Sequence, residues 1–333
     1  MTNVHPDVEA ILAAGRASGA LPFQAMSPHD ARVAHASRRL AHQLPSERVS
    51  ERRDFTIAGP AGPVPVRLYR PLSALADEPL PCLVFIHGGG WVLGNLDSHD
   101  SLCCHLVNAA RCCVVAVDYR LAPEHPFPAA IDDCAAAFAA IVAQASSLNI
   151  DASRVAVGGD SAGGNLAAVV ALMGRDGNLP MPIHQSLIYP VVDVDRRLED
   201  YGPNSAGMSI TGATMVYFCD QYVARASDRA DWRASPLKAA SLAGLPPALV
   251  ITCGHDPLKA EGILYADRLE EAGVRVTRLH LSDQTHGMIT MTKVISVSAG
   301  VQDFVAAGLR DAFDGCLGRV FRSPLSPTLA EIE

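Results

Sequence analysis

Short apolar runs alternate along most of the chain with longer stretches in which apolar residues recur at helical spacing. The first two runs flank the turn Gly59-Pro-Ala-Gly62 and predict a β-hairpin. The later runs are continuously apolar, as expected of strands that crossover helices cover on both faces of a parallel sheet. The pattern predicts an α/β fold with a mostly parallel eight-stranded sheet flanked by helices. The expected strands are Asp54–Ala58, Val64–Tyr69, Cys82–His87, Cys112–Asp118, Arg154–Gly158, Gln185–Tyr189, Ala248–Cys253 and Val274–His280.

Two segments fall outside this alternation and carry helical patterns of their own. Residues 1–48 precede every strand, and Ser27 followed by Pro28 predicts a helix start with serine as the N-cap. Between the sixth and seventh strands a Gly/Pro-containing passage surrounds a helix-like segment at 211–223. We expect residues 195–235 to form an insertion over the C-terminal edge of the sheet. The other expected helices are Ser101–Ala110, Ala129–Ala145, Asn165–Gly174, Ala260–Ala272 and Gly300–Phe313.

The composition narrows the possible partners. Of the 333 residues, 49% are hydrophobic, enough for a large core, and the net charge of -8 disfavours nucleic acid or an anionic membrane as a partner. The amino-terminal residues lack the pattern of a signal peptide and the apolar runs are too short to span a membrane, so we expect a cytoplasmic protein. The nine cysteines are expected to be buried free thiols, with a zinc site at Cys103, Cys104 and His105 as a less favoured alternative.

Candidate chemistry centres on Gly159-Asp160-Ser161-Ala162-Gly163, which has the G-x-S-x-G spacing of a nucleophile elbow. An apolar run precedes this corner and an apolar helical stretch follows it. A serine at the tip of such a turn has a strained backbone, and the flanking glycines let other backbone approach closely. Its Oγ then stands clear of the sheet, and the N–H groups of the following helix point at the group it attacks. Ser161 is therefore the candidate nucleophile.

Partners for Ser161 are expected at the ends of other strands. Asp256 and His286 each follow a predicted strand, and the carboxyl ends of parallel strands gather at the edge of the sheet where ligands bind. Their order after Ser161 is the one found in α/β-hydrolases. Asp283 is a rival acid, but it would have to fold back on its own loop. The triple glycine at 88–90 offers backbone N–H groups to an anion, although a plain turn or a phosphate loop would have the same composition.

Five motifs stand out along the chain: HGGGW (87–91), DYRLAPEHPFPAA (118–130), GDSAGGN (159–165), LPPALVITCGHDPL (245–258) and THGM (285–288). Together they resemble the hormone-sensitive-lipase-like family of α/β-hydrolase esterases of the bacterial family IV type, and the GDSAG form marks a subgroup. The similarity runs from about residue 20 to residue 315, and residues 26–32 resemble the start of the family's cap. One departure is Lys259-Ala-Glu261, where the family often carries a further acidic pair.

This resemblance implies roles for individual residues. Ser161 would attack an ester carbonyl with His286 as the base, and Asp256 would orient His286, with no metal or organic cofactor. N–H groups of Gly89, Gly90 and Ala162 would bind the oxyanion, Gly88 would shape their loop, and Asp160 would brace the elbow. The implied domains are an α/β-hydrolase core (49–194 and 236–320), a helical cap (1–48 and 195–235) and a C-terminal tail (321–333).

The expected substrate is a small-molecule ester. Only 5% of the residues are aromatic and the insertion is short, so we predict short or medium acyl chains. An amidase or small-metabolite deacetylase, an acyltransferase and a non-catalytic ligand-binding relative remain alternatives, and a homodimer is plausible. The apolar residues expected nearest the substrate are Trp91, Met208, Met215, Phe218 and Met288.

Overall fold

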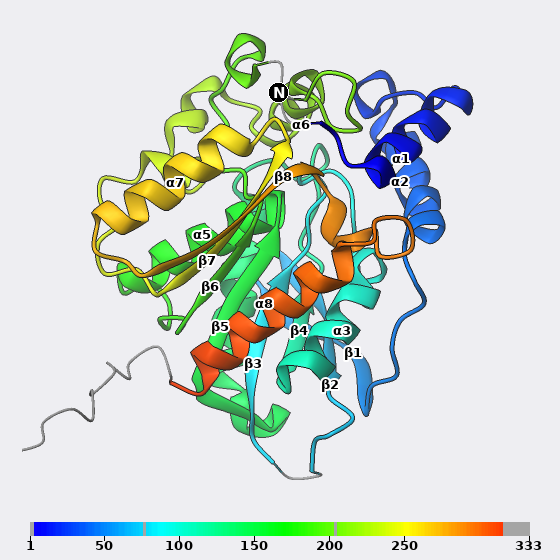
Figure 1. Cartoon of the computed structure of the whole chain (residues 1–333). Coiled ribbons are helices and arrows are strands. Elements are labelled where there is room, and N and C mark those ends of the chain that lie inside the picture. The colour runs from blue at the N-terminus through cyan, green and yellow to red at the C-terminus, as the bar shows by residue number, and fades with distance from the viewer. Residues whose placement is uncertain (1–2, 76–77, 203–204, 316–333) are drawn as a thin grey trace, which may run out of the picture.

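The computed structural model describes residues 3–75, 78–202 and 205–315, and its centre is an eight-stranded sheet (Figure 1). Each expected strand is present, which confirms the predicted fold. The tail expected at 321–333 lies outside the described residues. The strands are β1 (Glu51–Gly59), β2 (Gly62–Arg70), β3 (Leu80–Ile86), β4 (Cys113–Val117), β5 (Ile150–Asp160), β6 (Gln185–Ile188), β7 (Ala248–His255) and β8 (Val276–Thr285).

The strand order is β1-β2-β4-β3-β5-β6-β7-β8. β1 and β2 form the predicted antiparallel hairpin, and β2 also pairs antiparallel with β4. All later pairs are parallel, so the carboxyl ends of β3 to β8 meet at one edge of the sheet. That edge is the one at which the candidate site residues were expected.

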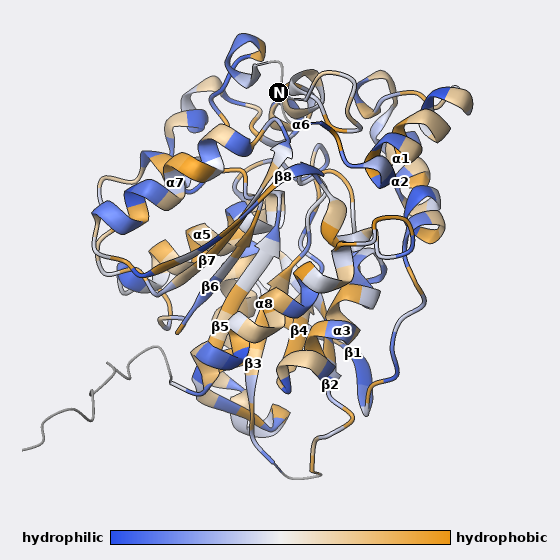
Figure 2. Ribbon diagram, viewed as in Figure 1, coloured by the Kyte–Doolittle hydropathy of each residue, from blue (hydrophilic) through white to orange (hydrophobic). Residues whose placement is uncertain are grey.

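Helices cover both faces of the sheet, and the sheet separates two hydrophobic cores. α3 and α8 pack on one face, whereas α5 and α7 pack on the other (Figure 1). α4 packs on the same face as α5 and α7. Figure 2 shows hydrophobic residues concentrated on the central strands, and β3 is buried along its whole length. The helices are α1 (Pro6–Ala17), α2 (Pro28–His42), α3 (Asp100–Ala110), α4 (Ala129–Ala143), α5 (Ala162–Arg175), α6 (Gly212–Tyr222), α7 (Lys259–Glu271) and α8 (Ser298–Phe313).

Several strands run further than the apolar pattern predicts, and β5 and β8 are the two that lead into the candidate site. β5 extends to Asp160, because Gly159 and Asp160 still pair with β6 although neither side chain is apolar. β8 extends to Thr285, where it pairs with His255 after a shift in register. Because β8 is an edge strand with alternating exposure, much of its sequence is polar. Two candidate site residues follow these polar ends directly: Ser161 comes after the last residue of β5, and His286 comes after the last residue of β8.

The amino-terminal helices and the insertion meet above the carboxyl ends of the parallel strands, at the top of Figure 1. α2 begins as predicted, with the Ser27 hydroxyl accepting a hydrogen bond from the N–H of Asp30. α6 contacts the short helix η1 (Phe23–Ala25), and the rings of Phe23 and Phe218 lie 6.1 Å apart. In the part of the chain that the structure describes, no helix has the length and hydropathy needed to cross a membrane.

Candidate active site

Ser161 stands at the corner between β5 and α5 with φ 56° and ψ -117°, a backbone conformation that residues other than glycine rarely adopt. Its N–H donates to the carbonyl of Ile188, 2.8 Å away, which ties the strained corner to β6. A Cβ at Gly163 would lie 1.9 Å from the Ile86 carbonyl oxygen, and one at Gly159 would lie 2.3 Å from the same oxygen. Both glycines of the elbow are therefore required by close packing against β3.

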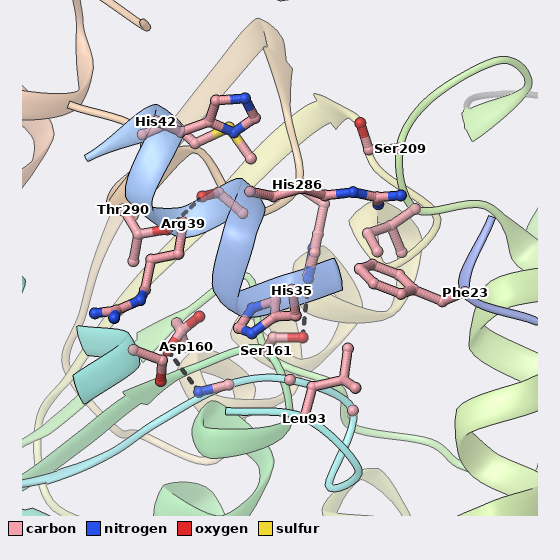
Figure 3. Close-up of a pocket in the computed structure, with 18 of the residues that line it drawn as sticks. Phe23, His35, Arg39, His42, Leu93, Asp160, Ser161, Ser209, His286 and Thr290 are labelled. Atoms are coloured by element: carbon pink, nitrogen blue, oxygen red, sulfur yellow. Dashed lines mark hydrogen bonds between the residues drawn. The ribbon is translucent and has the colours of Figure 1, made fainter. Parts of the chain in front are cut away.

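Ser161, His286 and Asp256 form a continuous chain of hydrogen bonds. The Nε2 of His286 lies 2.9 Å from Ser161 Oγ (Figure 3). Its Nδ1 lies 2.8 Å from Asp256 Oδ2. The other oxygen of Asp256 accepts the N–H of Leu258 at 2.8 Å. All three side chains are buried, and Asp256 is only 1% exposed. The arrangement suits transfer of a proton from the hydroxyl to the imidazole while the carboxylate holds the ring.

The electrostatics at His286 favour its charged form. Burial by itself lowers the pKa of this imidazole, but the negative charge and hydrogen bond of Asp256 outweigh that effect and raise the pKa above its usual value. Asp160 and Glu261 contribute in the same direction. The Tyr189 ring packs against the imidazole with the centroids 4.6 Å apart. The pair can therefore hold the proton taken from Ser161.

The loop after β3 brings glycine backbone next to the elbow. Gly89 and Gly90 have φ values of 124° and 60°, and a Cβ at Gly90 would lie 2.3 Å from the Phe218 ring. The N–H groups of these two glycines make no hydrogen bond to any other described residue, and the N–H of Ala162 starts the first turn of α5. Three donors are thus available for an anionic oxygen at this corner.

Asp160 holds this loop against the elbow. Its Oδ1 accepts the N–H of Gly88 at 2.8 Å and lies 3.0 Å from Nε2 of His99, whose Nδ1 lies 2.8 Å from Ser98 Oγ. Burial raises the pKa of Asp160, but His99 and the Gly88 N–H outweigh it and leave the pKa lowered. A Cβ at Gly88 would lie 2.5 Å from Asp160 Oδ2. The sequence suggested a bracing role for Asp160 but gave no reason to single out His99.

A pocket opens above Ser161, with one wall formed by α2 and another by apolar side chains (Figure 3). Phe218 and Met215, both expected near the substrate, line it. Its cavity holds about 150 Å³. The lining side chains outside the elbow and glycine loop are Phe23, His35, Arg38, Arg39, His42, Gln43, Leu93, Ser98, His99, Ser209, Ile210, Met215, Phe218, His286, Thr290 and Met291.

The other three residues expected at the substrate do not line this pocket. Trp91 has φ 58° and turns into the core, where its ring stacks on Tyr222 with the centroids 4.3 Å apart. Met288 is fully buried in the core on the α3 and α8 face, and Met208 packs against the same core. Being apolar and close in sequence to a functional loop is therefore not enough to reach the substrate, because the backbone turn decides which way the side chain points.

The zinc alternative finds no support in the geometry. His105 is hydrogen-bonded through both ring nitrogens, to Glu47 at 2.8 Å and to Asp303 at 2.9 Å. Cys103 and Cys104 are buried free thiols, as are the other six cysteines of the described chain. Among the residues that the structure describes, no cluster of three or more His, Cys, Asp or Glu side chains could hold a metal ion.

Comparison with known proteins identifies the class to which this chain belongs. Residues 83–290 match the family described as having the alpha/beta hydrolase fold, and the chain is a member of that family. The resemblance to hormone-sensitive-lipase-like esterases is confirmed by this match and by the relatives below, whereas the GDSAG subgroup stays a prediction.

Among its relatives is the carboxylic ester hydrolase LipN of Mycobacterium tuberculosis, 44% identical over 76% of this chain and 69% of that protein. An ethyl acetate hydrolase of Pseudomonas putida is 37% identical over 88% of this chain and 94% of its own length. The solved structure of an ester-hydrolase from the metagenome of Lake Arreo matches with a TM-score of 0.89 and 41% identity, covering 93% of this chain and 99% of that one. The enzyme class expected from the sequence, a carboxylic ester hydrolase, agrees with these names.

Proposed function

We propose that this protein is a serine carboxylesterase with Ser161 as nucleophile, His286 as general base and Asp256 as the acid that orients it. The observation that carries the proposal is the buried hydrogen-bond chain through these three side chains, next to the free N–H groups of the glycine loop. The names of its relatives, carboxylic ester hydrolase and ethyl acetate hydrolase, support the same reaction.

In this mechanism Ser161 Oγ attacks the ester carbonyl while Nε2 of His286 takes its proton. The N–H groups of Gly89, Gly90 and Ala162 stabilise the negative oxygen that develops, each donor contributing on the order of 3 kcal/mol. His286 then protonates the departing alkoxide. Water, activated by the same imidazole, hydrolyses the acyl-enzyme and restores Ser161. The steps use only groups of this chain, the ester and water.

Stoichiometric labelling with a serine-directed organophosphate tests the assignment. We expect one label per chain at Ser161 and no label in Ser161→Ala, which should fold normally and fail to hydrolyse esters. An unlabelled wild-type protein would favour a non-catalytic ligand-binding relative. Parallel assays of an ester and its matching anilide separate an esterase from an amidase, and an added alcohol acceptor reveals any acyl transfer.

We further propose a preference for short or medium acyl chains. The rings of Phe23 and Phe218 stand side by side at the pocket, where Met215 and Ile210 also narrow the apolar space. A series of p-nitrophenyl esters of increasing acyl length should give its highest kcat/KM well below twelve carbons. A maximum at longer chains would contradict this preference while leaving the esterase reaction intact.

Three expectations from the sequence stay proposals alongside this one: a cytoplasmic location, a homodimer and the division of the chain into a core and a cap. The contacts between η1 and α6 support a cap built jointly from the two segments. Size-exclusion chromatography with light scattering measures the oligomeric state directly.

A further inference from the structure

One face of α2 gives the pocket a basic wall. His35, Arg38, Arg39 and His42 follow one another at spacings of three, one and three residues, so all four lie on the same side of the helix. All four line the pocket above Ser161. The whole chain carries a net charge of -8, so two arginines at this position are a local exception rather than a reflection of the composition.

Within the part of the chain that the structure describes, no carboxylate forms an ion pair with either of these two arginines. Their charges are therefore not neutralised by any described residue. Arg38 donates to the carbonyl of Leu21 at 3.0 Å and lies over the Phe23 ring at 4.7 Å, both of which are neutral groups. The Arg39 guanidinium has no hydrogen-bond partner within the described chain, and Figure 3 shows it on the side of the pocket opposite Phe23. Arg39 is thus free to bind an anion.

The carboxylates nearest to this wall already have partners. Asp160, at the floor of the pocket, is bonded to Gly88 and His99. Arg39 also borders a second cavity, which is lined by three aspartates and two further arginines. Arg67 pairs there with Asp54 and with Asp97, at 2.6 and 2.8 Å. The remaining acid of that cavity, Asp100, accepts from Ser46, Arg52, Arg67 and Tyr69.

The two histidines of the basic wall, His35 and His42, add hydrogen-bonding groups beside the two arginines. Burial, together with the charges of His99 and Arg39, lowers the pKa of His35 to about 4, so this imidazole is neutral at pH 7. Burial and the charge of Arg38 also lower the pKa of His42. In the described residues neither imidazole has a hydrogen-bond partner. Both imidazoles can therefore donate a hydrogen bond to a bound molecule or accept one from it. The positive charge of the two arginines disfavours binding of a cation in the same region.

We propose that the preferred substrates are esters that also carry a carboxylate. The basic wall formed by α2 would bind this carboxylate while Ser161 attacks the ester. Arg38 and Arg39 would supply the charge, and His35 would hydrogen-bond the polar part of the molecule close to the reacting carbonyl. The apolar side of the pocket, with Phe218 and Met215, would hold the intervening carbon chain. This inference rests on the proposed esterase function and names its substrate class.

The test compares pairs of esters that differ only in whether a carboxylate ends the carbon chain. Monoethyl glutarate against ethyl butyrate places the carboxylate on the acyl side, and 4-acetoxybutyrate against propyl acetate places it on the alcohol side. We expect a higher kcat/KM for the anionic member of at least one pair. In Arg38→Gln/Arg39→Gln the anionic-to-neutral ratio should fall about tenfold or more, the size of effect that close charge pairs give in a partly buried site. Added salt should reduce the same ratio in the wild type.

Arg48→Gln is the matched control, because Arg48 is exposed, follows the same helix and does not line the pocket. It removes one positive charge and should leave the ratio unchanged. A wild type that prefers the neutral member of both pairs, or a ratio that the double variant leaves unchanged, would overturn the proposal while the esterase function stands. Calorimetric titration of Ser161→Ala with monoethyl glutarate distinguishes failure of the anion-site proposal from failure of the proposed esterase function. If this variant binds the ester and the added changes Arg38→Gln/Arg39→Gln weaken the binding, the anion site is supported even if no ester is hydrolysed.

Discussion

At the scale of single residues, the Asp256 carboxylate acts on His286 in two ways. It holds Nδ1 of the ring at 2.8 Å and so fixes the tautomer, and its charge stabilises the imidazolium. Asp256→Asn keeps the size of the side chain but removes both effects. We expect kcat to fall by about 10⁴-fold, as the same change does in triad proteases, with the fold retained. Steady-state kinetics and circular dichroism measure the two properties.

Asp283→Asn is the control for that substitution. Asp283 lies three residues before His286, but in the described structure its carboxylate bonds only to the side-chain amide of Gln284, at 3.3 Å. We therefore expect near wild-type kcat. If this variant were inactive and Asp256→Asn were active, the acid of the triad would have been assigned to the wrong residue.

The pH profile follows from the charge next to His286. Because the base must be neutral, kcat/KM should rise through the pKa of His286 and level off on the alkaline side. Asp256 raises this pKa, so the rising limb should lie above the ordinary value for histidine. In Asp256→Asn the raising charge is gone while burial still lowers the pKa, so the limb of the residual activity should move to lower pH. A limb that stayed in place would mean that another group controls it.

Sequence reasoning found the residues whose position follows from local chain geometry. Ser161 follows from the spacing of its glycines, and Asp256 and His286 follow from their places after strands. His35 and Arg39 were missed, because their role depends on how α2 lies over strands far away in the sequence. The spacing of polar residues along one helix predicts which side of the helix is polar. It does not predict which part of the folded protein lies next to that side.

At the scale of elements, strand positions were predicted well because buried parallel strands are almost purely apolar. The ends of β5 and β8 were not, since Asp160 and Thr285 are polar residues that pair only because a neighbouring strand is present. The direction of Trp91 was also unpredictable, because it depends on a left-handed backbone turn after the glycines.

The glycine loop and α6 constrain each other at Gly90. A Cβ there would lie 2.3 Å from the Phe218 ring, at a φ of 60° that costs a residue with a side chain about 1–2 kcal/mol. We expect Gly90→Ala to lower the stability and to lower kcat by about 10- to 100-fold. The loss in kcat should be somewhat smaller than when one hydrogen-bond donor to the oxyanion is removed completely. Adding Phe218→Ala removes the collision but not the backbone strain, so the double variant should regain part of the lost kcat. No recovery would mean that the ring is not what limits the loop.

At the scale of the whole molecule, the pocket above Ser161 has its walls because two segments distant in the sequence close over the sheet edge. Arg32 of α2 donates to the carbonyls of Val92 and Ala122 at 2.8 and 2.9 Å and pairs with Glu124. Thr214 of α6 donates to Gln24 at 2.8 Å. An α/β core with an insertion could be read from the alternation of elements, but these contacts join residues up to 190 positions apart and leave no local trace in the sequence.

A buried ion pair joins the insertion to the core. Arg196 donates to Glu261 Oε2 at 2.6 Å, and the other oxygen of Glu261 accepts the N–H of Val192 at 2.8 Å. Burial raises the pKa of Glu261 to about 7, although Arg196 acts to lower it. This group therefore binds a proton more readily in the folded than in the unfolded chain. Its contribution to stability is present below its ordinary pKa and is lost as the pH rises through 7.

Arg196→Met should strengthen that pH dependence. Without the guanidinium, Glu261 stays neutral at pH 6, but at pH 8 the folded protein must bury a lone carboxylate or take up a proton at a cost. We expect a loss of about 2–4 kcal/mol at pH 8 and a clearly smaller loss at pH 6, measured as the drop in Tm at both pH values. Arg197→Met, at the exposed neighbouring position, should change Tm little at either pH. An equal loss at both pH values would mean that Arg196 stabilises the insertion through its packing against Tyr201, over whose ring it lies at 4.5 Å, and not through its charge.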